Sequence, residues 1–273
     1  MSATQLTVRR LLIDLSTPFA RHWNGGDAFR TAWFNALSMS FPLGEQFFID
    51  SVRAGLALLP DTERARFGSE VRGFIGQEAT HRRIHALFNA QLARQGHVNA
   101  WEARIRHRIE RLEGAHPRHV VAITAATEHF TAILAEHLLT HPQVLDGAEP
   151  RLCTLWLWHA AEESEHRATA FDLYRALGGN ERWRRRWFLL VSWHFLTDAL
   201  RQTVRNLDHD GALWRVSTWR SAARFFCGRH GLLRHTFGPW CGYWSGRFHP
   251  LRRGGEAGMK WLKGNTGQYA SLP

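Results

Sequence analysis

The stretch Trp156-Leu157-Trp158-His159-Ala160-Ala161-Glu162-Glu163-Ser164-Glu165-His166 places two histidines and three acids within about three helical turns. An earlier stretch, Gly76-Gln77-Glu78-Ala79-Thr80-His81-Arg82-Arg83-Ile84-His85, repeats its central spacing. Both contain Glu-x-x-His, as Glu78 with His81 and as Glu163 with His166. On a helix these two positions share a face, with Cβ atoms roughly 5–6 Å apart. One carboxylate and one imidazole from each stretch can therefore meet the same metal ion.

A further glutamate precedes each Glu-x-x-His pair at a matched distance. Glu45 lies 33 residues before Glu78, and Glu128 lies 35 residues before Glu163. A Glu from each of two helices and a Glu-x-x-His from each of two others form the ligand set of di-metal helical bundles. The candidate metal ligands are Glu45, Glu78, His81, Glu128, Glu163 and His166. The alternative for Glu45 is a solvated position beside the apolar stripe of its helix.

Three nearby residues are candidates for extra ligands or for groups that support the ligands. His85 and His159 each lie one helical turn from a predicted ligand. Glu162 or Glu165 could replace Glu163 if their helix is rotated, but the spacing of Glu163 to His166 copies that of Glu78 to His81. His129 follows Glu128 and points some 100° away from it on a helix, so it is expected to pack rather than to bind metal.

Apolar periodicity and breakers predict an all-α fold, a four-helix bundle with a helical extension. Residues 1–26 have helix potential near Val8 to Leu15. The expected bundle helices are a short one ending near Ser40, and others over 42–59, 62–95, 118–140 and 149–177, with a polar connecting helix over 99–113. Matched distances from the interhelical turns place Glu45 and Glu78 at one depth. Residues 1–181 form the predicted bundle, and 182–273 a C-terminal extension that packs on it.

The C-terminal extension differs in composition from the bundle. Residues 182–273 hold 16 Lys and Arg against 4 Asp and Glu, and 8 of the 13 Trp. This composition suits binding to an anionic membrane surface. It suits nucleic acid less well, because no recognition motif is present. In the third interpretation these helices cover the bundle and their arginines are simply solvated. The apolar run 188–196 is expected to end at Asp198 and is too short to span a bilayer. A helix over 212–226 should follow, and then largely irregular structure.

Overall composition excludes several classes of protein. A hydrophobic content of 44% with 17 Phe excludes a disordered chain. Three scattered cysteines and the absence of Cys-x-x-Cys argue against a zinc ribbon or a disulfide scaffold. The first ten residues lack the apolar core of a signal peptide. We therefore expect a cytoplasmic protein, peripheral to the inner membrane face if the basic extension binds lipid, and a homodimer.

The sequence resembles a bacterial family labelled "predicted metal-dependent hydrolase", which is thought to be ferritin-like. The resemblance extends from about residue 30 to 250. It rests on the runs Phe41-Pro42-Leu43-Gly44-Glu45-Gln46-Phe47-Phe48, Phe74-Ile75-Gly76-Gln77-Glu78-Ala79-Thr80-His81, Glu128-His129-Phe130-Thr131-Ala132, Trp158 to His166, and Phe248-His249-Pro250. His85 and His159 also fit the family's pattern, which strengthens them as candidate ligands. The label implies hydrolysis, which the ligand set alone does not establish.

Carboxylate-rich ligation with two or three imidazoles favours iron or manganese over structural zinc. The leading expectation is an enzyme with two iron ions, or one manganese and one iron, that activates dioxygen. It would oxidise a small, largely apolar substrate with electrons from an external reductant. The alternatives are a two-metal hydrolase of an ester or phosphate, and a non-catalytic iron-binding or membrane-associated helical protein.

Overall fold

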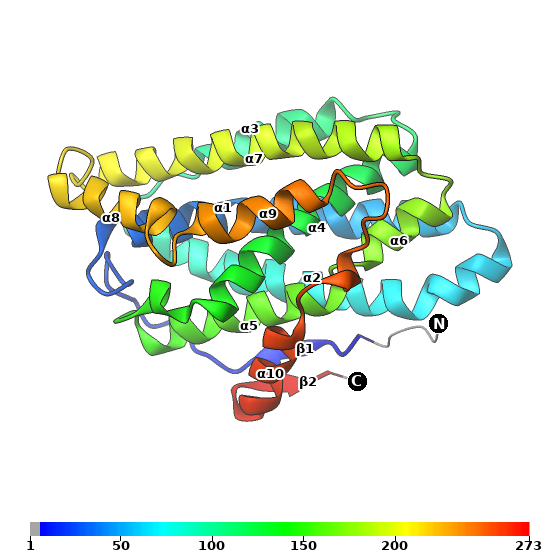
Figure 1. Ribbon diagram of the computed structural model, residues 1–273. Coiled ribbons are helices and arrows are strands. Elements are labelled where there is room, and N and C mark those ends of the chain that lie inside the picture. The colour runs from blue at the N-terminus through cyan, green and yellow to red at the C-terminus, as the bar shows by residue number, and fades with distance from the viewer. Residues whose placement is uncertain (1–5, 273) are drawn as a thin grey trace.

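Four long helices surround the core of the computed structural model, which describes residues 6–272 (Figure 1). They are α1 (Ala28–Ala57), α2 (Asp61–Arg94), α4 (Pro117–Thr140) and α5 (Pro150–His166). The short helix α3 (Ala100–Glu110) makes the predicted connection between α2 and α4. The only strands within 6–272 are two of three residues each. The predicted all-α bundle is therefore confirmed.

Helices α1 and α2 form an antiparallel pair. Only three residues, 58–60, separate them, and the first half of α1 contacts the last part of α2. Ser38 near the start of α1 bonds Asn89 near the end of α2, at 2.8 Å between the side chains. Buried aromatic and aliphatic side chains fill the space between the four long helices, among them Phe48, Val52 and Phe74. This core brings the inner faces of the helices together.

The expected break between two helices near Pro42 is wrong, because α1 continues through it. A proline inside a helix lacks the N–H that would bond the carbonyl four residues earlier. Here that carbonyl belongs to Ser38, and it accepts a hydrogen bond from Nδ2 of Asn89 at 2.9 Å. The neighbouring helix thus satisfies the group that Pro42 leaves free.

The prediction of one unbroken helix over 149–177 is also wrong, because the segment is divided into α5 and α6 (Thr169–Ala176). At the break, the Arg167 guanidinium donates to the Ser164 carbonyl, which the backbone N–H of Ala168 would bond in a continuous helix. It also reaches the carbonyl of Gly254 at 3.0 Å. The break therefore follows directly after His166 and ties this point to the C-terminal segment.

Asp198 does not end the apolar run before it, contrary to expectation. Helix α7 runs from Glu181 to His209, and Asp198 is fully buried within it. Its carboxylate lies 2.6 Å from Nε of Arg104 and 2.5 Å from Nη2 of Arg108, both on α3. Burying an unpaired carboxylate would be costly, but the two arginines compensate its charge. The helix can therefore continue through Asp198. Within residues 6–272, no helix is long and apolar enough to cross a membrane.

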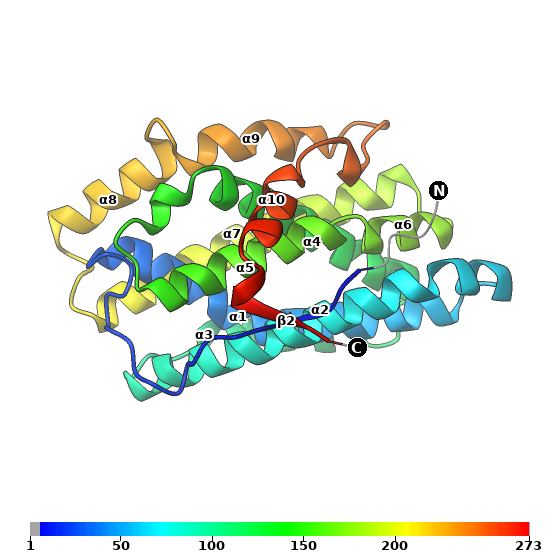
Figure 2. The same ribbon diagram turned by 90° about the horizontal axis from the view of Figure 1, so that it is seen from below.

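The C-terminal part is more regular than the sequence predicts. Helix α8 (Val216–Cys227) corresponds to the expected helix. The segment expected to be irregular contains α9 (Leu232–Gly242), α10 (Glu256–Gly264) and three-residue 3-10 turns at Pro250–Arg252 and Thr266–Gln268, while another 3-10 turn, Pro142–Leu145, follows α4. Gly258 of α10 lies so close to Ser164 that a Cβ would sit 2.8 Å from its Cβ. Close approach at this glycine lets α10 pack across α5 (Figure 2).

The helix potential predicted near Val8 to Leu15 is not realised. Residues Arg9–Leu11 form strand β1, which pairs antiparallel with β2 (Tyr269–Ser271). The segment before and within β1 lies on α2, where a Cβ on Gly73 or Gly76 would come within 2.6 Å of Leu6 or 2.3 Å of Val8. These glycines on α2 therefore allow the N-terminal segment to lie close along this helix, and Figure 2 shows the two side by side.

Candidate metal centre

The six residues predicted as metal ligands lie together in the middle of the bundle. Each of the four long helices contributes, and every one of these side chains is buried, at 4% exposure or less. The ligands are Glu45 from α1, Glu78 and His81 from α2, Glu128 from α4, and Glu163 and His166 from α5. The four helices thus place four carboxylates and two imidazoles in one buried cluster. Their role as metal ligands stays a prediction.

One group of donor atoms surrounds His166. Its Nε2 atom lies 3.1 Å from Oε1 of Glu78 and 3.3 Å from Oε2 of Glu128. Oε1 of Glu163 is 3.4 Å from the same nitrogen. One atom from each of Glu78, Glu128 and His166 lies within 4.8 Å of the others. This spacing leaves room for a cation at one point.

A second group adjoins the first. Glu78, His81 and Glu163 form one set of donors within 4.8 Å of one another, and Glu45, His81 and His159 form another. Nδ1 of His81 is 3.5 Å from Oε1 of Glu163. Glu78 belongs to the group with Glu128 and His166 and to the group with His81 and Glu163, so its carboxylate lies between these two groups. The arrangement fits a pair of metal ions better than a single one.

The donor atoms of this cluster lack hydrogen-bond partners although they are buried. The unpartnered atoms are both carboxylate oxygens of Glu45, Glu78 and Glu128, Oε2 of Glu163, Nδ1 of His81 and Nε2 of His166. A buried polar group without a partner destabilises a fold by about 1–3 kcal/mol, and a charged one by more. So many unpartnered acceptors at one point are what a site for cations requires. The residues therefore fit a metal centre.

The histidines are oriented by hydrogen bonds on their far sides. Nε2 of His81 is 2.9 Å from Oε2 of Glu162, and Nδ1 of His166 is 2.9 Å from Oε1 of Gln77. Since both oxygens accept, these ring nitrogens carry the protons, and the other nitrogen of each ring faces the cluster. A donor bond of this kind is typical of metal-binding histidines. Glu162 thus lies behind His81 and belongs to none of the groups of converging donors.

Arg9 lies on the outer side of the cluster, behind Glu162 and Glu165. The sequence alone did not indicate this role for Arg9. Its Nη1 atom donates to Oε1 of Glu162 at 3.0 Å and to Oε2 of Glu165 at 2.6 Å. Nε2 of Gln77 donates to the same Glu165 oxygen at 2.9 Å. The guanidinium pairs with both outer acids and holds Glu162 beside His81. No local pattern in the sequence reveals a partner more than 150 positions away.

His85 and His159 occupy different places relative to the cluster. Nε2 of His159 lies 3.1 Å from Oε1 of Glu163 and 3.9 Å from Oε1 of Glu45, so this ring faces the donors. Its Nδ1 atom is 2.6 Å from Nε2 of His85, and Nδ1 of His85 is 2.9 Å from Ser38 Oγ. His159 is therefore placed as an additional ligand, whereas His85 supports it from behind.

Burial and mutual repulsion set the charges of the cluster in the absence of metal. Burial, with the nearby carboxylates of Glu78 and Glu163, raises the pKa of Glu45 and of Glu128 well above the usual value. Burial disfavours a charged His81, but hydrogen bonds to Glu162 and Glu163 outweigh it and raise the His81 pKa to about 10. Protons therefore hold positions that a cation would take.

His129 packs as expected. It is buried, its ring stacks on Tyr243 at 4.7 Å between centroids, and Nε2 lies 3.2 Å from the Pro239 carbonyl. Burial lowers its pKa to about 4. The neutral ring of His129 therefore packs between α4 and the end of α9.

An apolar cavity of about 500 Å³ leads to the cluster. It lies between α1, α3, α4 and α7, and Glu45 is the cluster residue in its wall. Most of its lining is aromatic or aliphatic, for example Phe48, Trp101 and Ile123. The exposed residue Arg111 lies in the wall at the outer end. An organic molecule can thus approach the cluster through apolar surroundings.

Comparison with known proteins identifies one family. The family model described as "predicted metal-dependent hydrolase" matches residues 7–254, which include every residue of the cluster. No curated protein and no solved structure matches the chain.

Proposed function

The chain belongs to the family of predicted metal-dependent hydrolases, and on that premise we propose that its buried cluster binds two divalent metal ions and hydrolyses a largely apolar ester. The observation that supports the metal pair most directly is the set of unpartnered donors shared by Glu45, Glu78, His81, Glu128, Glu163 and His166. His159 is proposed as a further ligand because its Nε2 faces Glu45 and Glu163. The family label and the donor set together favour hydrolysis.

When bound, a pair of divalent ions supplies Lewis acidity and a means of activating water at neutral pH. The chain supplies the geometry and the proton sites. Gln77 and Glu162 hold the protonated nitrogens of His166 and His81 away from the cluster, so that the free nitrogens face it. Glu45 lies where the cavity meets the cluster, so its carboxylate is the candidate ligand that a molecule in the cavity would approach.

The cavity supports an apolar substrate rather than a small polar one. Its volume of about 500 Å³ is typical of pockets for small organic molecules. Arg108, Arg111 and His194 lie among its outer residues, where a polar or anionic end of the molecule would remain near solvent. We propose that the ester group to be cleaved lies near Glu45, while its acyl or alkyl chain lies in the cavity against the apolar side chains.

Metal content tests the centre itself. Protein isolated from cells supplied with zinc, manganese and iron is expected to contain about two metal ions per chain by elemental analysis. Glu128→Gln keeps the side-chain size but removes a charged ligand, so metal content should fall by half or more. Glu110→Gln, an exposed glutamate on α3, is the matched control and should retain full content. Folded wild-type protein without metal would refute the proposal.

Chain-length selectivity tests the cavity. Gly44 lines it, and a Cβ there meets nothing within 4 Å, so the Gly44→Leu side chain starts in open space and is expected to occupy part of the cavity. With p-nitrophenyl esters of increasing acyl length, the variant should lose the long substrates several-fold more than the short ones. Gly238→Leu, at an equally open position on α9 outside the cavity, should leave the preference unchanged. Equal losses for all chain lengths would show that the cavity does not hold the substrate.

Oxidation with dioxygen is the second candidate, and one observation favours it. Two Glu and two Glu-x-x-His pairs from four helices form the donor set of di-iron carboxylate proteins. Hydrolysis would proceed with zinc and without oxygen, whereas oxidation requires iron or manganese, dioxygen and an external reductant. Oxygen consumption by the reduced iron form, with no ester cleavage by the zinc form, would favour oxidation over hydrolysis.

A further inference from the structure

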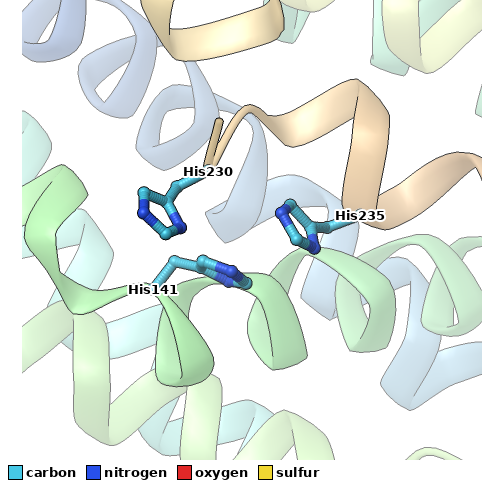
Figure 3. Close-up of side chains that lie close together, drawn as sticks. All are labelled: His141, His230 and His235. Atoms are coloured by element: carbon cyan, nitrogen blue, oxygen red, sulfur yellow. The ribbon is translucent and has the colours of Figure 1, made fainter. Parts of the chain in front are cut away.

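Three histidines outside the main cluster converge where α9 packs against the end of α4 (Figure 3). His141 caps the C-terminus of α4, His230 lies in the turn before α9, and His235 is in the first turn of α9. One ring nitrogen of each lies within 4.8 Å of one ring nitrogen of both others. None of the three belongs to the donor groups of the main cluster.

Two of the rings have their donor nitrogen already fixed by the backbone. Nδ1 of His141 lies 3.2 Å from the carbonyl oxygen of His137, and Nε2 of His235 lies 3.3 Å from that of Arg229. A carbonyl oxygen only accepts, so each of these nitrogens carries the proton. The remaining nitrogen of each ring, Nε2 of His141 and Nδ1 of His235, then presents a lone pair. Metal-binding histidines typically show this pattern.

A fourth histidine lies beside the three. His137 is 5% exposed, and neither of its ring nitrogens has a hydrogen-bond partner. Its ring centroid is 4.8 Å from that of His141 and 5.7 Å from that of His235. An unpartnered buried imidazole needs an explanation, and a cation beside it supplies one. His137 stacks on His141 and is not one of the three converging donors, so it lies beside the group and leaves the fourth position open.

The chemistry of this group selects the kind of metal. It offers imidazole nitrogens and no carboxylate, whereas calcium and magnesium require oxygen ligands. Arg229 and Arg234 are exposed neighbours that disfavour cations held by charge alone. Zinc, copper and nickel bind imidazole well. Three histidines with an open fourth position match the coordination of zinc in several sites.

We propose that His141, His230 and His235 bind one divalent transition-metal ion of the zinc type, separate from the main cluster. The bound ion joins the end of α4 to the start of α9, two segments about 90 positions apart in the chain. The family description covers metal dependence but names no ligand, so this site adds a third ion to the pair proposed above.

Zinc binding by the metal-free full-length chain tests the assignment. The protein is equilibrated with zinc, freed of excess ion, and its zinc content is measured. About three ions per chain are expected for the wild type and about two for the double variant His230→Asn with His235→Asn. Substitution at exposed His230 leaves the core intact, and His107→Asn, exposed on α3, is the matched control. Far-ultraviolet circular dichroism checks that each variant is folded.

The outcomes separate this site from the main one. If the main cluster binds no zinc, the wild type should still hold one ion, which the double variant loses. Equal zinc content in the double variant and the wild type would overturn the proposal. Loss of the third ion with His209→Asn instead would assign it to His97, His209 and Asp210, a group in which Arg21 already pairs with the acid at 3.1 Å. That result would overturn the proposal as well.

Discussion

Oε1 of Gln77 lies 2.9 Å from Nδ1 of His166. Gln77 directly precedes the predicted ligand Glu78 in the sequence. The amide oxygen accepts, so the proton is on Nδ1 and the Nε2 lone pair faces Glu78 and Glu128. Gln77 also donates through Nε2 to Glu165 and to the Thr7 carbonyl, both at 2.9 Å. Gln77 therefore links the N-terminal segment to His166, a candidate metal ligand.

Loss of this hydrogen bond should weaken metal binding without removing a ligand. Gln77→Leu is expected to lower metal affinity by about 10- to 100-fold, the usual effect of removing a partner of a metal-binding histidine. Competition with a chelator of known affinity measures the change. Gln77→Glu keeps an acceptor for Nδ1 of His166 and should recover much of the affinity. If both variants bind like the wild type, Gln77 does not position His166.

Stability of the metal-free protein should decrease as pH rises. A group whose pKa is raised by folding contributes stability below its unfolded pKa and loses it as pH passes the folded pKa. For His81 that contribution is complete below 6.5 and disappears toward about 10, and Glu45 and Glu128 act in the same direction from their usual pKa upward.

Metal should reverse this trend, because bound ions replace the protons. Thermal unfolding with and without zinc across pH 6 to 9, roughly the range in which histidine titrates, measures both effects. The stabilisation by zinc is expected to grow with pH, and protons should be released on binding. A stabilisation that shrinks as pH rises would show that these carboxylates are not exchanged for metal.

Close packing at Gly76 should make it intolerant of a methyl group. A Cβ there would sit 2.3 Å from Val8 Cγ2, so Gly76→Ala must displace the N-terminal segment. We expect a loss of roughly 1–3 kcal/mol, as for other overpacked positions, despite the better helix propensity of Ala. Gly44→Ala, in open space on α1, should be neutral or stabilising. Urea unfolding compares the two, and equal stabilities would contradict this packing.

The basic extension presents an apolar row that is suited to lipid. Leu189, Trp193, Leu196 and Leu200 of α7 are 46–67% exposed and lie at helical spacing. Together with the net positive charge of residues 182–273, they predict binding to vesicles that contain anionic lipid. Binding should fall steeply with salt, and Trp193→Glu should reduce it several-fold.

Neutral vesicles are the control for that measurement. Binding that ignores lipid charge would contradict an electrostatic contribution, and no binding would leave the row free for another partner. The expected homodimer also stays a prediction, and sedimentation of the wild type and of Trp193→Glu tests whether the same row joins two chains. Nucleic acid is not expected to compete with vesicles.

The sequence predicts that the six candidate ligands lie together, because the period of each helix and its distance from a turn can be read from the local sequence. What it does not predict depends on distant partners. Continuation of α1 through Pro42 requires Asn89 to satisfy a freed carbonyl, and burial of Asp198 requires Arg104. The pairing of β1 with β2 joins segments from opposite ends of the chain, each only three residues long. No periodicity reveals such a pair.

That pairing has a consequence for biosynthesis. Arg9 stands in β1 opposite Ser271, and its side chain pairs with both Glu162 and Glu165 behind the candidate metal ligands. A ribosome makes all six candidate ligands long before it makes residues 269–271. The strand pairing that holds Arg9 beside these two acids can therefore form only after residues 269–271 have been made. A chain shortened before residue 269 would contain all six candidate ligands but not this support for Arg9.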